Sequence, residues 1–283
     1  MIAARAKLQC VAGIACALLA GSATAAEPAL TVTLGARSET YTPASLLAHP
    51  AVTTITIPRD VSYKRSMTYR AVPVAVLLPG VAPDATLRFL AEDGFAANQL
   101  AAPLLADSAG ARAYLAVEPA DASWPPLKPG DPASAGPFYL VWLRPELGRI
   151  QPEQWPYQVK RIDEMRPLAQ RFPAIVPAAG LAIDGKVNRG FATFTRNCMV
   201  CHTMNLGGDA TIGPDLNVPY NPTEYLRADA LRRLIRDPQS LRHWTAAKMP
   251  AFNVATLSDR DYNDVLAYLQ HMTNRKSGVP VTK

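Results

Sequence analysis

Apolar and polar residues alternate, or apolar residues form short runs, at several places in the first 165 residues of the chain. Both patterns are typical of β-strands, and glycines separate several of the runs. The predicted strands are 31–34, 52–57, 87–91, 113–117 and 138–142. Short helices are expected at 43–47 and within 71–78. This part of the chain is therefore predicted to be a β-rich α+β domain.

The last third of the chain has apolar residues at helical spacing instead. Three of them share one helix face, namely Val187, Phe191 and Phe194. A second helix is predicted to begin after the cap Asn221, in the run Asn-Pro-Thr-Glu, and to stop before Pro238. Ser258 is the expected cap of a final helix. The C-terminal region is therefore predicted to be all-α.

A segment rich in proline and small apolar residues separates the two patterns. Pro167, Pro173 and Pro177 lie in it, and it reads as an interdomain linker over 167–182. The chain is thus expected to be multidomain. The expected units are a domain over 27–166, a helical domain over 183–275 and a tail over 276–283.

Residues 1–26 have the features of a secretory signal peptide. Two basic residues precede an apolar stretch over 8–20, and an A-x-A site ends at Ala25. The stretch is shorter than the roughly 20 apolar residues of a membrane anchor. A lipoprotein anchor on Cys16 is an alternative, but the preceding residues lack the expected leucine. We expect cleavage, a periplasmic location and a mature chain without a transmembrane segment.

The charge pattern adds one exclusion. The formal net charge is +6, from 29 basic and 23 acidic residues, and two of the basic residues lie in the predicted signal segment. The remaining charges are scattered along the chain and form no basic stripe. We therefore expect no nucleic-acid partner.

The cysteines of the mature chain carry the strongest motif. The first two of the four cysteines leave with the signal segment, and residues 198–202 read C-M-V-C-H. C-x-x-C-H is the attachment signature of c-type haem. Cys198 and Cys201, three positions apart on a helical turn, reach the two vinyl groups of one porphyrin, and His202 reaches the iron. A thioredoxin-like pair would need a βαβ pattern, and a zinc site two more nearby ligands. The motif thus predicts one covalent haem c, and a single motif argues against a two-haem peroxidase.

Residues 184–273 resemble a class I cytochrome c. The resemblance rests on the terminal helices, the C-x-x-C-H motif, the Gly-Pro turn at Pro214 and the Met-Pro segment at Met249. In that family the methionine of such a segment is the distal iron ligand, and the carbonyl at the Gly-Pro turn orients the proximal histidine. The resemblance implies that Met249 is the second axial ligand and that Pro214 orients His202.

Six other side chains are alternatives for the sixth ligand: Met165, Met199, Met204, Met272, His243 and His271. Met204 is too close to His202 to cross to the other haem face easily, and Met199 lies inside the attachment loop. Met165 and Met272 are expected in the core or between domains. His243 is expected at the surface, with ligation in a rearranged state as its alternative, and His271 is expected to face solvent. Histidine and methionine ligation fills both axial positions, which suits outer-sphere electron transfer.

Residues 30–162 resemble the molybdopterin-binding domain of the sulfite oxidase family. The resemblance rests on a strand leading into a Val-Pro helix at 68–74, an Asp-Gly-aromatic turn at 92–95, closing strands at 136–141 and an exit segment at 155–162. In that family a cysteine thiolate binds molybdenum, but residues 27–197 contain no cysteine. A soft ligand set is therefore missing. We expect a degenerate scaffold without molybdopterin.

These features favour an electron-transfer protein or subunit over a free-standing enzyme. The haem domain would carry single electrons, with no catalytic residue beyond the haem site. The N-terminal domain would dock it to a redox partner, either an exported oxidoreductase or a respiratory complex. One alternative is a molybdenum-dependent oxidoreductase with a built-in haem c acceptor. A third is a haem sensor in which Met249 dissociates to admit a ligand.

Overall fold

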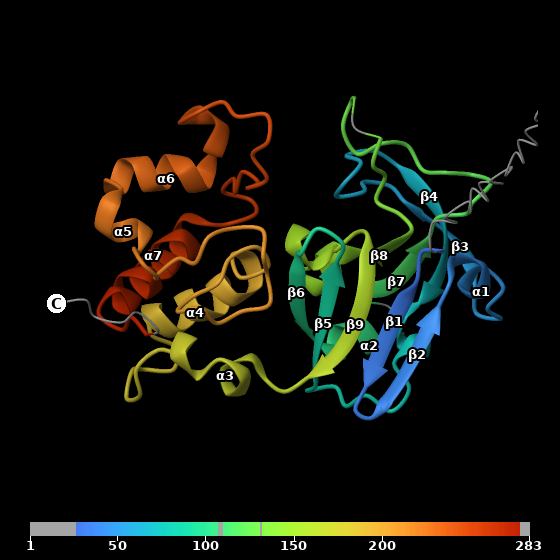
Figure 1. The fold of residues 1–283 in the computed structure, drawn as a ribbon, viewed down its shortest axis with the longest axis horizontal. Coiled ribbons are helices and arrows are strands. Elements are labelled where there is room, and N and C mark those ends of the chain that lie inside the picture. The colour runs from blue at the N-terminus through green and yellow to red at the C-terminus, as the bar shows by residue number, and fades with distance from the viewer. Residues whose placement is uncertain (1–26, 107–109, 131, 278–283) are drawn as a thin grey trace, which may run out of the picture.

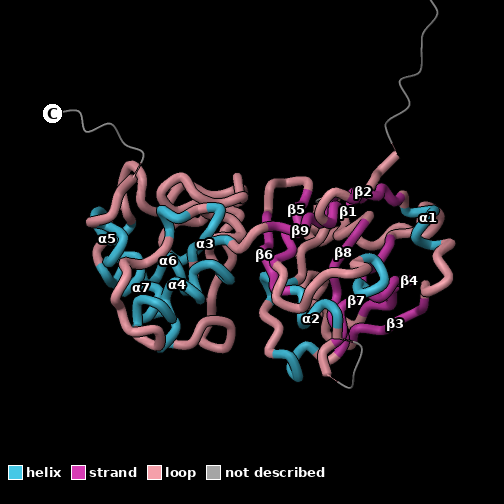
Figure 2. The backbone as a smooth tube through the Cα atoms, turned by 90° about the horizontal axis from the view of Figure 1, so that it is seen from below, coloured by secondary structure: helices cyan, strands magenta, loops and turns pink. Residues whose placement is uncertain are grey.

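The computed structural model describes residues 27–106, 110–130 and 132–277. The predicted signal segment therefore lies outside the described residues. A β-rich region and a helical region lie side by side, joined by the segment that follows β9 (Figures 1 and 2). Within the described part of the chain, no helix combines the length and the apolar composition needed to cross a membrane.

Two sheets build the β-rich region. The first has the order β2-β1-β9-β5-β6, with β1 and β9 parallel and its other pairs antiparallel. Its strands are β1 Leu30–Leu34, β2 Arg37–Tyr41, β5 Thr86–Ala91, β6 Ala96–Leu100 and β9 Val159–Met165. The second is antiparallel with the order β3-β4-β7-β8. Its strands are β3 Thr53–Ile57, β4 Met67–Pro73, β7 Arg112–Val117 and β8 Phe138–Leu143.

One apolar core is shared by the two sheets. Phe89, Phe138 and Trp142 are among its fully buried side chains. Alternating residues of β5 and nearly every residue of β7 and β8 are buried, as expected for strands packed on one or both faces. The strongly apolar runs were therefore the segments that sequence patterning could find.

Short helical segments connect the strands. They are α1 Pro43–Leu47, α2 Ala101–Leu105 and 3₁₀ turns at Val74–Leu77, Pro145–Gly148 and Pro152–Gln154. The helix predicted within 71–78 is wrong in its first half, because β4 continues to Pro73. Residues Arg70 to Pro73 pair with β7, and the ladder holds them extended.

Between residues 166 and 277 the structure has five α-helices: α3 Leu168–Arg171, α4 Lys186–Asn197, α5 Pro222–Tyr225, α6 Ala228–Arg236 and α7 Asp259–Thr273. The crossing of α4 on α7 is close at Gly190. A Cβ atom there would lie 1.9 Å from the backbone oxygen of Asp264, so only glycine fits. The rings of Phe194 and Tyr268 pack beside this crossing with centroids 5.1 Å apart.

The second predicted helix is two helices in the structure. Its expected capping box is present, with Asn221 and Glu224 capping each other's backbone. The chain then becomes extended at Leu226 and restarts as α6, so a single continuous helix is wrong. Ser258 caps α7 as predicted, accepting a 3.1 Å hydrogen bond from the Asp261 amide.

The segment 167–182 lies against the helical region. It contains α3 and a 3₁₀ turn, Pro173–Ile175, and Ile175 is fully buried. The Tyr268 hydroxyl donates a 2.7 Å hydrogen bond to the Ile175 carbonyl. The Ala178 amide donates to His271 Nε2 at 3.0 Å, and His271 is half-buried, so it faces solvent only in part. Together these contacts fix the segment on α7.

Candidate functional site

The C-terminus of α4 places the two cysteines of the C-x-x-C-H motif. The Cys198 amide donates to the Phe194 carbonyl at 2.9 Å, and the His202 amide donates to the Cys198 carbonyl at 2.9 Å. The motif therefore continues the helix by one turn, which brings residues three and four positions apart together. Both cysteines are free thiols, and burial raises the pKa of each to about 12.

His202 is held by the turn at Pro214. Its Nδ1 atom lies 2.8 Å from the Pro214 carbonyl oxygen. A carbonyl only accepts, so Nδ1 carries the proton and Nε2 has a free lone pair for a metal. Burial also lowers the pKa of His202, which favours the neutral imidazole. A Cβ atom on Gly213 would lie 2.5 Å from the ring, so the close approach of this turn requires glycine.

Met249 lies in the loop between Ser240 and α7, in an apolar cluster separate from that of Cys198. It is half-buried and packs with Phe252, Leu257 and Tyr262. In Figure 1 this loop and the segment after α4 both lie on the side of the helical region that faces the sheets.

The other candidate ligands lie in different surroundings. Met199, Met204 and Met272 are buried in the cluster between α4 and α7. Met165 ends β9, and His243 is exposed on the loop before Met249. Methionine side chains in the α4–α7 cluster fill core space, as expected of a flexible apolar side chain.

The β-rich region lies directly on the attachment motif. Val200 belongs to the apolar core of the two sheets, and Cys201 packs against that core. The Ala96 amide donates to the Val200 carbonyl at 3.0 Å, and the Thr211 amide donates to the Gly94 carbonyl at 3.2 Å. The hairpin between β5 and β6 thus covers one side of the motif. Sequence reasoning missed this contact because β6 was not predicted as a strand.

An ion-pair cluster at Asp209 locks the same interface. Its carboxylate accepts from Arg88 Nη1 at 2.8 Å, from Asn98 Nδ2 at 3.2 Å and from the Arg171 guanidinium. Arg88 Nη2 also donates to Asp163 at 2.6 Å. The Asp209 side chain is 5% exposed. Burial alone would raise the pKa of Asp209, but hydrogen bonds from Arg171 and Arg88 outweigh burial and lower it.

A second contact joins the hairpin to the Met249 loop. Lys248 Nζ lies 3.9 Å from a carboxylate oxygen of Asp93, with the lysine side chain 61% exposed. The pair is exposed, so its own contribution to stability is small. The contact shows instead that the loop carrying Met249 lies against the turn between β5 and β6, which also contacts Thr211.

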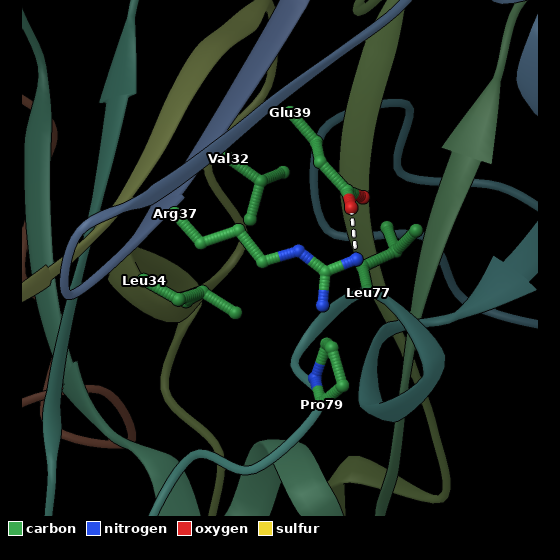
Figure 3. A pocket seen from close by; sticks show the side chains of 6 residues that line it. All are labelled: Val32, Leu34, Arg37, Glu39, Leu77 and Pro79. Atoms are coloured by element: carbon green, nitrogen blue, oxygen red, sulfur yellow. Dashed lines mark hydrogen bonds and ion pairs between the residues drawn. The ribbon is translucent and has the colours of Figure 1, made fainter.

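A small pocket at the edge of the first sheet is too small for a cofactor. It is lined by Val32, Leu34, Leu77, Pro79 and the ion pair of Arg37 with Glu39 (Figure 3). Its volume is about 10 Å³, room for about one water molecule.

Comparison with known proteins identifies the helical region. Residues 187–273 match the sequence model of the family "Cytochrome c". One similar solved structure is the sulfane dehydrogenase SoxCD from Paracoccus pantotrophus, with 18% identity and a TM-score of 0.34. That match covers 51% of this chain and 40% of the other, so this chain spans well under half of it. No curated protein matches significantly. The C-terminal region is a cytochrome c domain, which implies a covalently bound haem c.

Proposed function

We propose that this protein is an exported c-type cytochrome that carries single electrons on one haem. Cys198 and Cys201 would form the two thioether bonds, and His202 and Met249 would be the axial ligands of the iron. The observation that carries this proposal is the 2.8 Å contact between His202 Nδ1 and the Pro214 carbonyl, which leaves Nε2 free beside the two free thiols. When bound, the haem supplies a one-electron couple at the iron.

The residues around the motif prepare the site for that couple. Pro214 fixes the ring plane and tautomer of His202, and Gly213 lets the turn approach the ring. Met249 is half-buried against its apolar cluster, and methionine ligation favours a high reduction potential. With both axial positions filled, electrons pass without direct ligand chemistry at the iron.

The N-terminal domain is proposed to be a molybdopterin-domain-like scaffold that holds no molybdenum and docks a redox partner. The lack of cysteine in residues 27–197 supports the first part. The second part is supported by the hairpin of β5 and β6, which touches both the attachment motif and the Met249 loop. A partner bound to the β-rich region would therefore lie close to the haem. The partner would be an exported oxidoreductase or a respiratory complex of the periplasm.

Replacing the proposed distal ligand tests the haem assignment. Met249→Ala should keep the haem attached but leave the iron five-coordinate, so the reduced protein should bind carbon monoxide readily. Absorption spectra with and without carbon monoxide measure this. Met165→Ala, a half-buried methionine at the end of β9, is the matched control and should leave the spectrum unchanged. A low-spin spectrum that survives in Met249→Ala would reject Met249 as the ligand.

Metal content tests the scaffold assignment. Elemental analysis of protein purified from its native envelope should give about one iron per chain and no molybdenum. Iron and molybdenum in equal amounts would overturn the scaffold proposal and support a molybdenum oxidoreductase with a built-in haem acceptor.

A further inference from the structure

A carboxylate from the β-rich region lies beside the haem attachment motif. Glu153 is part of the 3₁₀ turn Pro152–Gln154 and is 8% exposed. Its Oε2 atom accepts a 3.3 Å hydrogen bond from Asn197 Nδ2. Asn197 is itself 2% exposed and directly precedes Cys198. A buried ionisable group of one domain is thus tied to the residue before the first thioether position of the other.

The turn that carries Glu153 is held firmly. The Gln151 amide donates to Gln154 Oε1 at 3.0 Å, closing the turn on itself. The indole nitrogen of the fully buried Trp142 donates to the Gln154 carbonyl at 2.9 Å. Because this backbone is anchored to the core of the sheets, the carboxyl group keeps its place at the interface.

The charge of Glu153 raises the pKa of the thiol at both attachment positions. After burial, its charge is the next cause that raises the pKa of the Cys198 thiol, and it also contributes at Cys201. The cations that face it are Arg196 on α4 and Lys64 on the loop before β4. Burial raises the pKa of Glu153 itself, and a backbone hydrogen bond and these two cations only partly oppose the shift. The group is therefore poised to change its protonation closer to neutral pH than an ordinary glutamate.

Solvent protons can reach this carboxyl group. A cleft of about 330 Å³ lies between α4 and the edge of the first sheet. Glu153, Gln99 and Gln154 line it from the β-rich region, and Thr195 and Arg196 line it from α4. Both sides of the cleft contribute polar side chains, so it can hold the water that carries a proton to the buried group.

We propose that Glu153 is a redox-linked proton acceptor that couples the haem potential to pH. This rests on the proposed function, because it requires a haem at Cys198 and Cys201. The ionised carboxylate favours the ferric state, which carries one more positive charge than the ferrous state. Glu153 takes one proton from solvent as the iron takes one electron from its donor protein, so the charge of the site is unchanged by reduction.

The direction of the effect follows from the charges. Below the pKa of Glu153 the group is neutral and the reduction potential is high. As pH rises through that pKa, the carboxylate ionises and the potential falls. A charge within about 4–6 Å shifts an equilibrium by about tenfold or more, and we take the lower end of that range. For a one-electron couple, a tenfold change corresponds to about 59 mV.

Potentiometric titration of the full-length protein between about pH 4 and pH 8 tests the proposal. We expect the wild-type potential to fall as pH rises. Glu153→Gln should abolish the fall that is due to Glu153. At high pH its equilibrium between the oxidised and reduced forms should lie about tenfold further towards the reduced form than that of the wild type. Glu153→Gln keeps an oxygen that can accept from Asn197. Glu146→Gln, at an exposed position seven residues earlier, is the matched control and should titrate like the wild type. Any pH dependence from other groups would persist in both variants.

Two further readouts separate the possible failures. Infrared difference spectra of the wild type should show a protonated carboxyl band on reduction that shifts in heavy water, which needs no variant. Equal pH dependence in wild type and Glu153→Gln, or no such band, overturns the role of Glu153. A protein without a covalent haem or a reversible couple would reject the proposed function instead.

Discussion

The β-rich and helical regions differ in how their interiors are built. In the β-rich region, side chains from both sheets form one continuous apolar core. In the helical region, the apolar side chains divide into a cluster between α4 and α7 and a smaller cluster around Phe252. Buried asparagines join the loops there: Asn217 donates to the Met272 carbonyl at 2.8 Å, and Asn205 donates to the Ala174 carbonyl at 2.8 Å.

This difference indicates that the two regions depend on the haem to different degrees. A continuous core supplies its own hydrophobic stabilisation. A region with two small clusters has less hydrophobic stabilisation of its own, and a bound cofactor adds its binding free energy to folding. We therefore expect the β-rich region to fold without haem and the helical region to need it.

Removing the attachment cysteines should give the largest effect. Cys198→Ala combined with Cys201→Ala should abolish covalent haem completely and unfold the helical region, while the β-rich region stays folded. Haem staining on denaturing gels measures the first effect. Far-ultraviolet circular dichroism follows the helices. Fluorescence follows the β-rich region, which holds three of the four tryptophans. Joint loss of both regions would contradict their independence.

Breaking the Asp209 cluster should separate the two regions. Asp209→Asn leaves Arg171 facing a neutral side chain, while Arg88 keeps its ion pair with Asp163. Loss of one partner of a buried ion pair costs about 3–5 kcal/mol. Small-angle X-ray scattering should show a larger radius of gyration with both regions still folded. Glu92→Gln removes an exposed partner of Lys160 at 3.5 Å and should change stability by less than about 1 kcal/mol. Unchanged scattering in Asp209→Asn would show that other contacts hold the interface.

Gly94 tests the hairpin contact alone. It has a φ of +91°, and a Cβ atom there would lie 2.0 Å from Thr211 Oγ1. Gly80 has a φ of +77° with no atom within 4 Å of such a Cβ, so Gly80→Ala carries the backbone strain without the contact. The strain costs about 1–2 kcal/mol in both variants. Gly94→Ala should lose more unfolding free energy than Gly80→Ala, and adding Thr211→Ala should remove the difference. Equal losses of unfolding free energy in the two variants would mean that the Thr211 side chain moves aside without cost.

Sequence reasoning found the elements with a strong local pattern. Four of the five predicted strands lie within observed strands, the fifth, 52–57, begins one residue before β3, and α1 has the predicted bounds. It missed β2, which reads R-S-E-T-Y at an exposed edge, β6, which is mostly small and polar residues, and β9, which is rich in charged residues. Those strands form because a neighbour offers free backbone groups, and that information lies far away in the sequence.

The site divides in the same way. The motif 198–202 is local in the sequence, and the resemblance to class I cytochromes c pointed to the turn at Pro214; the structure brings His202 Nδ1 to 2.8 Å from the Pro214 carbonyl oxygen. Three residues make contacts across the interface: Asp209, Gly94 and Glu153. In the sequence each of them resembles an ordinary polar or glycine residue of a loop or turn. Partners 121 residues apart, such as Arg88 and Asp209, become visible only when the two regions are docked.

Acid should open the interface by a smaller and graded amount. Hydrogen bonds from Arg171 and Arg88 outweigh burial and lower the pKa of Asp209 in the folded protein. A lowered folded pKa means that the stabilisation is present above the ordinary aspartate pKa, about 3.9, and is lost as pH falls through the folded value. Each pKa unit is worth about 1.4 kcal/mol. Scattering measured from neutral pH to below about pH 4 should show the regions separating only at the acid end. In Asp209→Asn the regions should already be apart at neutral pH, so this acid-dependent step should be missing; a wild-type interface that opens above about pH 5 would assign the transition to another group.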